Sequence, residues 1–273
     1  MLVLKTLIED TNSNLPVLNL TAREVDILQM NPSAWIDGNS GVVSNGGSVS
    51  LVRDKTGLSD WGLPSGATQL PVIVQSGNRN ALRFSGAISK AGLKKTNNES
   101  SFPSDGIFTL FLLLRCPVNG TEGFASTGGN ICGNNAPEPD CVRFRLGADN
   151  YTGNNLFYNH GSKAASNPNN YPINTSTPAN FRDNAWHMTI ITANEAGHTC
   201  EWDGEQRQAT AILPAVFSSA ESRSLTVGSA DNPFAHSFQG DIAQLIMIPG
   251  KLTASQKNTV AQYLSDVQAE LSL

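Results

Sequence analysis

Three acidic residues, Glu201, Asp203 and Glu205, alternate with Trp202 and Gly204. On a continuous strand, side chains two residues apart point to the same face, so these carboxylates would form one row. Two carboxylates about 5–5.5 Å apart are what retaining glycoside hydrolysis uses, one as nucleophile and one as general acid. An Asp-Gly pair also favours a two-residue type I′ hairpin turn. We expect this turn at Asp203 and Gly204, where it would reverse the chain and separate the acids.

No other segment carries a catalytic motif. The histidines are scattered, without an acid at a telling spacing, at His160, His187, His198 and His236. The sequence also lacks the Gly-x-Ser-x-Gly motif of a nucleophile elbow. We therefore expect a protein that is not an enzyme, with a retaining glycoside hydrolase built on the three acids as the alternative.

Two polar segments combine side-chain amides with aromatic rings. Their candidate ligand-binding residues are Asn155, Tyr158, His160, Asn170 and Tyr171. Amides pair with sugar hydroxyls, and aromatic rings cover the apolar faces of sugars, although asparagine is also a common turn residue. The surrounding stretches 119–140 and 149–180 show little periodicity, and we expect them to be long binding loops. Trp61, in a segment rich in glycine and proline, is a further candidate ligand contact.

Of the four cysteines, Cys132 and Cys141 lie nine residues apart in a segment rich in glycine, asparagine and proline. A zinc site is not expected, because there is no Cys-x-x-Cys pair and no histidine follows at the spacing of a zinc finger. The two cysteines form either a disulfide within the loop or two free thiols, and the sequence leaves both open.

Charge and hydropathy exclude several classes of protein. The 273 residues carry a net charge of −5, and no basic run is longer than Lys94-Lys95. A nucleic-acid surface needs a basic stripe to neutralise phosphates, so we expect no nucleic-acid binding. No apolar stretch reaches the roughly 18 residues of a membrane span, so we expect no membrane insertion. The first residues reach Glu9 and Asp10 too early for a signal peptide.

Turn-forming residues, with 24 glycines and 14 prolines, separate short apolar runs. The run 107–115 is almost entirely apolar, as in a central strand that is covered on both faces. Residues 142–146 and 186–191 alternate between apolar and polar side chains, as in strands with one buried face. Further strands are predicted at 48–53, 71–74, 81–85, 225–228 and 242–248. This pattern favours one all-β domain, a two-sheet antiparallel sandwich.

Two capping boxes predict a helix near each end of the chain. Thr21 with Glu24 begins a short helix that runs through about Gln29, and Thr253 with Gln256 begins a C-terminal helix. The C-terminal helix has an apolar stripe made of Val260, Tyr263, Leu264, Val267 and Leu271. We expect this stripe to pack against the sandwich.

A series of segments, in order, resembles the concanavalin A-like, laminin G-like jelly-roll family. The matching segments are 34–37, 52–57, 81–86, 184–187, 238–246 and 251–264. For example, Ala81-Leu82-Arg83-Phe84-Ser85-Gly86 is similar to the family's Ala-Leu-x-Phe-Asp-Gly strand. The resemblance covers about residues 34–268. It implies the family's jelly-roll sandwich, with a hairpin turn at 203–204.

Two positions depart from the family pattern. Val52 stands where the family usually has tryptophan, and Ser85 stands where it often has aspartate. In some relatives an acidic residue near this position helps to bind calcium, which takes several oxygen ligands. Three acids remain, Asp37, Asp54 and Asp241, and we expect them to cap turns or strand ends. We therefore predict no cofactor, with calcium as the alternative.

Members of this family that have a short arm and no signal peptide resemble domains of tailed-phage virion proteins. The resemblance implies a non-catalytic surface-binding protein of the tail-fibre, receptor-binding or head-decoration type, assembled in the host cytoplasm and displayed on the virion surface. Residues 1–30 would form an arm and short helix that docks on other virion proteins or on its own copies, for example in a trimer. Residues 31–273 would form the sandwich and contact host-surface polysaccharide. The alternative is a purely structural capsid or tail cement protein without glycan binding.

Overall fold

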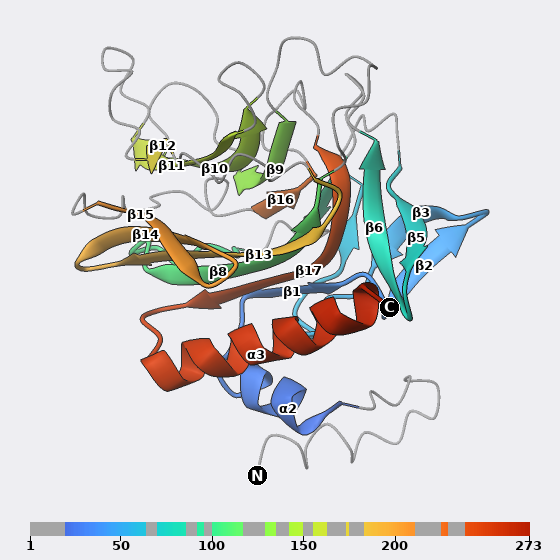
Figure 1. The fold of residues 1–273 in the computed structure, drawn as a ribbon, viewed down its shortest axis with the longest axis horizontal. Helices are drawn as coiled ribbons and strands as arrows, with labels where there is room; N and C mark the ends of the chain where they lie inside the picture. The colour runs from blue at the N-terminus through green and yellow to red at the C-terminus, as the bar shows by residue number, and fades with distance from the viewer. Residues whose placement is uncertain are drawn as a thin grey trace.

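The structure is a computed structural model. It describes residues 20–63, 70–85, 92–95, 100–116, 129–134, 142–149, 155–162, 173–174, 183–210, 225–228 and 238–273. In 129–134, 142–149, 155–162, 173–174 and 207–210 the description covers the backbone. Within these ranges the chain forms an antiparallel sandwich with two helices on one side (Figure 1). The predicted all-β sandwich is thus confirmed.

One antiparallel ladder lies directly beneath the helices. Its strands, in order across the sheet, are β15 (Glu205–Thr210), β14 (Gly197–Trp202), β13 (Trp186–Asn194), β8 (Phe108–Arg115) and β17 (Gln239–Pro249). The first residues of β17 pair with β6 (Arg79–Ser85), and its later residues pair with β1 (Ala34–Asp37). The partner changes at a bulge between Ile242 and Gln244. Beyond β6, β5 (Val72–Ser76) extends the sheet.

A second antiparallel ladder faces the first. Its strands, in order, are β12 (Ile173–Asn174), β11 (Asn155–Ser162), β10 (Val142–Asp149), β9 (Gly129–Asn134), β16 (Leu225–Val227), β7 (Leu93–Lys95), β4 (Trp61–Gly62), β3 (Ser48–Val52) and β2 (Val42–Asn45). The two ladders join along one edge, where Ser48 of β3 pairs with Val72 of β5.

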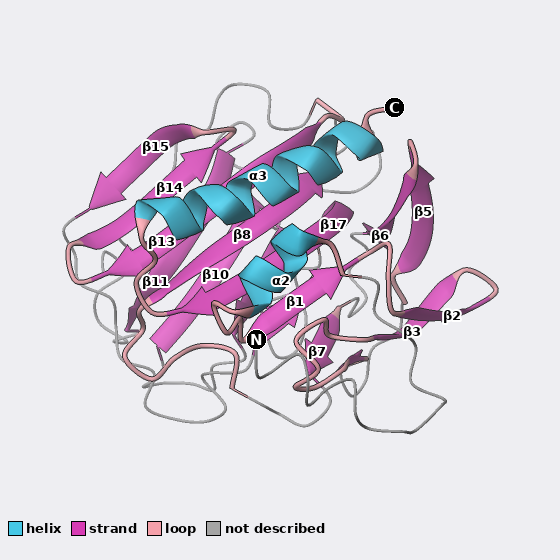
Figure 2. Ribbon diagram, turned by 90° about the horizontal axis from the view of Figure 1, so that it is seen from below, coloured by secondary structure: helices cyan, strands magenta, loops and turns pink. Residues whose placement is uncertain are grey.

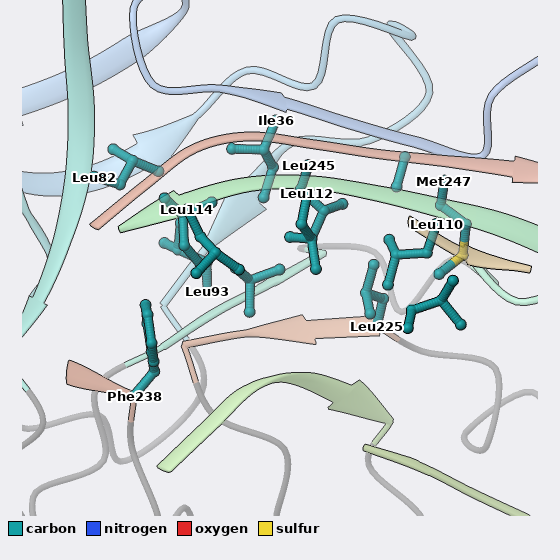
Figure 3. Close-up of a cluster of buried hydrophobic side chains, with 14 of the residues drawn as sticks. Ile36, Leu82, Leu93, Leu110, Leu112, Leu114, Leu225, Phe238, Leu245 and Met247 are labelled. Carbon is teal, nitrogen blue, oxygen red and sulfur yellow. The ribbon is translucent and has the colours of Figure 1, made fainter. Parts of the chain in front are cut away.

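Buried apolar side chains form two clusters, one on each face of the first ladder. The cluster between the ladders brings Leu112 and Leu114 of β8 together with Leu93 of β7 and Leu225 of β16 (Figure 3). The cluster on the other face packs the sheet against the helices. Since β8 supplies side chains to both clusters, its apolar run is explained, and the prediction of a strand covered on both faces is confirmed.

The two helices, α2 (Ala22–Leu28) and α3 (Ala254–Leu271), cover the outer face of the first ladder (Figure 2). Both begin at the predicted capping boxes. All five residues of the predicted apolar stripe of α3 are buried. Ile27 of α2 is fully buried in the same cluster. Helix α2 therefore packs on the sandwich, while residues 1–19 lie outside the described residues.

A buried ionic network fastens α2 to the sandwich. The ammonium of Lys55 donates to Glu24 Oε1 of α2 at 2.5 Å and to Asp37 Oδ2 of β1 at 2.9 Å. The hydroxyl of Tyr263 of α3 donates to the same Glu24 oxygen at 3.3 Å. Because Glu24, Asp37 and Lys55 are all less than a tenth exposed, each charge depends on its partners for the hydrogen bonds that water would otherwise supply.

Replacing Thr253 with alanine is expected to lower the free energy of unfolding by about 1 kcal/mol. The Thr253 hydroxyl accepts from the backbone N–H of Gln256 at 3.2 Å, and alanine leaves that donor without its acceptor. Urea denaturation checks the loss. Thr259→Ala is the control, because this hydroxyl bonds to the Ser255 carbonyl within the helix. An equal loss in both variants would contradict a specific role for the cap.

Candidate functional site

The predicted hairpin turn at Asp203 and Gly204 is present. Strand β14 ends at Trp202, β15 begins at Glu205, and these two residues pair directly. Asp203 has φ of 50° and Gly204 has φ of 81°, the two consecutive positive values that a type I′ turn requires. The chain therefore reverses in the middle of the acidic segment, and the three carboxylates do not form a row along one strand.

Two of the three acids, Glu201 and Asp203, are tied to different parts of the fold. The carboxylate of Glu201 accepts from the ammonium of Lys257, which lies on α3. The carboxylate of Asp203 turns back to β13, where it accepts from the backbone N–H of Met188 at 2.9 Å. Two acids that would have to act on one substrate thus face different elements, and one is neutralised by a lysine.

A histidine that the sequence analysis judged to lack nearby acids is the centre of the polar cluster at this turn. His187 Nδ1 lies 2.7 Å from Asp203 Oδ2, and His187 Nε2 lies 2.9 Å from Asp183 Oδ1. The imidazole also stacks on Trp202, with ring centroids 4.7 Å apart. The judgement that no acid stands at a telling spacing from His187 was wrong. Asp183 precedes it by four residues, and Asp203 reaches it through the hairpin.

The electrostatics of this cluster follow from its geometry. Burial alone would lower the pKa of His187, but hydrogen bonds and charge attraction from Asp203 and Asp183 outweigh it and raise the pKa above 6.5. Burial also opposes ionisation of Asp183, yet its bonds to His187 and to the N–H of Ala185 lower its pKa below 3.8. Nearby on β14, burial and the charge of Glu201 raise the pKa of the Cys200 thiol to about 12, so this thiol is not a nucleophile at neutral pH.

Trp61 is placed in the core and not at the surface. It belongs to β4 and has no exposed area. Its indole N–H donates to Asp54 Oδ2 at 2.9 Å, and the ammonium of Lys95 lies 5.7 Å from its ring. The prediction that Trp61 contacts a ligand is therefore wrong. Its glycine- and proline-rich surroundings suggested a loop, but the segment pairs with β3 and β7 and buries the ring.

Three of the other candidates, Asn155, Tyr158 and His160, lie on β11. The expectation of one continuous loop over 149–180 is wrong there, because β11 pairs along its length with β10 and in part with β12. Strands also interrupt the other expected loop, at 129–134.

The remaining candidates lie outside the part of the chain that the structure describes. These are Asn170, Tyr171 and Cys141. Cys132 lies on β9, of which the backbone is described. A ligand-binding role for Asn170 and Tyr171, and a disulfide between Cys132 and Cys141, stay predictions.

The acids that a calcium site would use are each paired with cationic side chains. The pairs are Asp37 with Lys55 at 2.9 Å, Asp54 with Lys95 at 3.5 Å, and Asp241 with Arg83 at 2.8 Å and Arg115 at 2.6 Å. Asp37 and Asp54 also cap the turns that follow them, as predicted, by accepting from the N–H groups of Asn39 and Thr56. Among the described residues no cluster of three or more acids, histidines or cysteines could hold a metal ion. These residues do not fit calcium.

Comparison of the whole fold with solved structures places it among known β-sandwich domains. The binding domain of Paraclostridial Mosquitocidal Protein 1 aligns with a TM-score of 0.57 and 13% identity over 88% of this chain and 53% of its own length. Domain 4 of AbnA, an extracellular arabinanase from Geobacillus stearothermophilus in complex with arabinotriose, aligns with a TM-score of 0.57 and 14% identity over 85% of this chain and 98% of its own. A Trypanosoma rangeli sialidase in complex with 2,3-difluorosialic acid aligns with a TM-score of 0.53 and 12% identity over 83% of this chain and 32% of its own.

At these identities the likeness concerns the fold. The chain is a β-sandwich of the type found in binding domains and in glycosidases, and this agrees with the jelly-roll resemblance of the sequence. It spans about half the length of the mosquitocidal binding domain and nearly all of the arabinanase domain. No protein-family model and no curated protein matches the sequence. No helix in the described ranges is long and apolar enough to cross a membrane.

Proposed function

We propose that the protein is a non-catalytic, glycan-binding sandwich that is displayed on a virion surface. The observation that carries the proposal is the reversal at Asp203 and Gly204, with Glu201 held by Lys257 and Asp203 held by His187. A retaining hydrolase needs two carboxylates that face each other across one substrate. This segment directs them to different elements, which leaves recognition as the activity that the fold supports best.

Two considerations support a glycan as the ligand. The fold extends over nearly the whole of an arabinanase domain whose structure contains arabinotriose. Strand β11 of the second ladder carries Asn155, Tyr158 and His160, and the other candidates, Asn170 and Tyr171, shortly precede β12 in the sequence. Sugar hydroxyls pair with amides, and sugar faces stack on aromatic rings, so neutral polysaccharide suits these residue types. Display on a virion rests on the family resemblance of the sequence, with the protein's own copies or other virion proteins as partners.

A glycan array that includes arabinan and host-surface polysaccharides tests the binding. We expect the intact protein to bind at least one class of glycan, and we expect Tyr171→Ala or Tyr158→Ala to weaken binding about tenfold, as for a central contact residue. Asn258→Ala is the matched control, because Asn258 is exposed on α3, on the opposite side of the first ladder. An array without any bound glycan would contradict glycan recognition and favour a structural cement protein.

Hydrolysis assays separate binding from catalysis. On the glycans retained by the array we expect no release of reducing sugar by the intact protein, and no change for Glu201→Gln or Glu205→Gln. If the intact protein cleaves a glycan and either variant loses the cleavage, the protein is a hydrolase and the proposal is wrong.

A test of attachment to a particle requires a deletion that leaves the core of the sandwich intact. Removing residues 1–30 would also remove Ile27 and Glu24, which are buried against α3 and Lys55. Removing residues 1–19 leaves α2 in place. We expect the shorter deletion to preserve glycan binding while it reduces incorporation into particles. Undiminished incorporation would contradict docking through residues 1–19.

A further inference from the structure

The imidazole of His187 joins two segments that otherwise belong to different parts of the chain. Asp183 lies just before β13, and Asp203 lies in the turn between β14 and β15. The side chain of His187 is 11% exposed, whereas those of Asp183 and Asp203 are 39% and 40% exposed. The ring is thus nearly enclosed, with one carboxylate at each nitrogen.

The number of protons on the ring follows from its two partners. An ionised carboxylate can only accept a hydrogen bond. With a carboxylate oxygen 2.7 Å from Nδ1 and another 2.9 Å from Nε2, both nitrogens must carry hydrogen for both bonds to exist. This state is the imidazolium. A neutral ring has one N–H and one lone pair, so one of the carboxylates would face a lone pair.

We propose that His187 is a proton-dependent clasp, which holds residue 183 and the 203–204 turn together as imidazolium and releases residue 183 when it is neutral. The inference concerns the conformation of this edge of the sandwich and does not depend on glycan binding.

The unequal support of the two acids determines which bond is lost. Asp203 is fixed independently of the histidine, because its Oδ1 accepts from the N–H of Met188 at 2.9 Å and its own N–H donates to the Met188 carbonyl at 2.9 Å. Asp183 uses one oxygen, Oδ1, for both His187 and the N–H of Ala185. A neutral ring therefore keeps Nδ1–H on Asp203 and turns its lone pair toward Asp183. The neighbouring Asn184, at φ of 65°, is held through its N–H to the Cys116 carbonyl at 3.0 Å, so the loss of that contact frees first the Asp183 side chain and the Ala185 N–H that it caps.

Among the described residues that pair with His187 or stack on its ring, none is a cation that could compete for the carboxylates of Asp183 and Asp203. Strand β8 places Leu114 at the paired position, and β14 contributes the indole of Trp202. Glu205, the cross-strand partner of Trp202, and Glu201, which is bound by Lys257, are further acids at this hairpin. Among the described residues, the charged groups bonded to His187 are the two carboxylates of Asp203 and Asp183, and they favour the imidazolium over the neutral ring.

The pH window of the clasp follows from the two shifted groups. The pKa of His187 is raised above 6.5, so the stability that the clasp contributes is complete below pH 6.5 and is lost as pH rises through the raised pKa. The pKa of Asp183 is lowered below 3.8, so its contribution is present above that pH and is lost on acidification through the lowered pKa. The clasp is closed at pH values between the lowered pKa of Asp183 and the raised pKa of His187.

NMR of the full chain with ¹⁵N-labelled histidine tests the inference. We expect both ring nitrogens of His187 to be protonated at pH 6.5, and we expect the titration midpoint to lie above 6.5. Asp183→Asn removes one charge and should move the midpoint down while the protein stays folded. Asp105→Asn is the matched control, because Asp105 caps Ile107 in the same way that Asp183 caps Ala185 but has no bond to a histidine. The control should leave the midpoint unchanged.

Hydrogen exchange at two pH values gives a readout of conformation. After correction for intrinsic rates, the amides of residues 184–187 should exchange faster above the His187 midpoint than below it, while those of Met188 and Asp203 stay protected. The same acceleration is expected in Asp183→Asn at all pH values. A His187 midpoint at or below 6.5, or a single protonated ring nitrogen at pH 6.5, would overturn the clasp. Equal protection of residues 184–187 on both sides of the midpoint would also overturn it.

Discussion

Replacing Asp54 with alanine is expected to lower the free energy of unfolding by about 3–5 kcal/mol, because it leaves a fully buried lysine without its counter-ion. Asp54 accepts hydrogen bonds from the N–H of Trp35, from the indole of Trp61 and from both the N–H and the hydroxyl of Thr56. The ammonium of Lys95 lies 3.5 Å from its Oδ2, and neither charged side chain is exposed. Alanine removes all these contacts at once.

The loop that contains Asp54 provides a matched control. Asp60 pairs with Arg53 at 2.6 Å, but the arginine side chain is 64% exposed. We expect Asp60→Ala to cost less than about 1 kcal/mol, since exposed ion pairs contribute little. Guanidinium denaturation of both variants makes the comparison. Similar losses in the two variants would contradict the role assigned to burial.

A double substitution distinguishes a lost charge partner from lost hydrogen bonds. Asp54→Asn with Lys95→Met removes the buried ion pair and retains one amide oxygen, which can accept from the N–H of Trp35; the bond from the indole of Trp61 to the second oxygen is lost in both the single and the double variant. We expect this variant to be more stable than Asp54→Asn alone, because the single change leaves the Lys95 ammonium bonded to Ser33 O at 2.6 Å but without a carboxylate to balance its charge. A double variant less stable than Asp54→Asn would show that the charge of Lys95 is not the source of the loss.

Gly77→Ala should destabilise the protein by about 2–5 kcal/mol, as the sum of backbone strain and a steric overlap. Gly77 has φ of 52°, and a Cβ there would overlap the carbonyl oxygen of Glu270 and lie 3.0 Å from the carbonyl carbon of Leu271. The turn between β5 and β6 caps the C-terminal end of α3, through Ser76 Oγ to the Leu271 carbonyl at 2.8 Å and Asn78 N–H to the Glu270 carbonyl at 2.9 Å. The added methyl group would push this turn away from the helix.

Gly57→Ala separates the two contributions. Gly57 has φ of 72°, but a Cβ there has nothing within 4 Å. This variant therefore reports the strain of a positive φ alone, about 1–2 kcal/mol. Thermal unfolding of both variants checks the prediction. If Gly77→Ala and Gly57→Ala lose the same stability, the close approach of the turn to α3 has no energetic role.

Much of the fold could be predicted because local patterns determine it. The continuous apolar run of β8 reflects burial on both faces, and the stripe on α3 reflects one buried face. The turn at Asp203 and Gly204 requires two positive φ values, which the Asp-Gly pair adopts at low cost. Each of these signals involves residues near one another in sequence.

The side-chain network could not be predicted, because its members come from distant segments. Lys55 joins Glu24 to Asp37, and Asp241 joins Arg83 to Arg115, across elements whose pairing and register the sequence does not specify. Asp37, Asp54 and Asp241 were expected to cap turns or strand ends, with calcium as the alternative, and their cationic partners could not be predicted because they lie elsewhere in the sequence. The strand at β11 was missed for a different reason. Its asparagines and glycine are typical of turns, and its pairing with β10 is a tertiary feature.

Strand β17 sets the order in which the polypeptide can acquire its structure during translation. It pairs with β1, β6 and β8, which contain residues 35, 83 and 112. These strands cannot form their pairs with β17 until the ribosome has synthesised more than 120 further residues after residue 112. Helix α3, which follows it, covers the apolar outer face of those strands. A nascent chain that stops before residue 239 therefore exposes unpaired strand edges and apolar surface to solvent. Until β17 and α3 leave the ribosome, we expect the incomplete domain to be prone to aggregation and to bind chaperones.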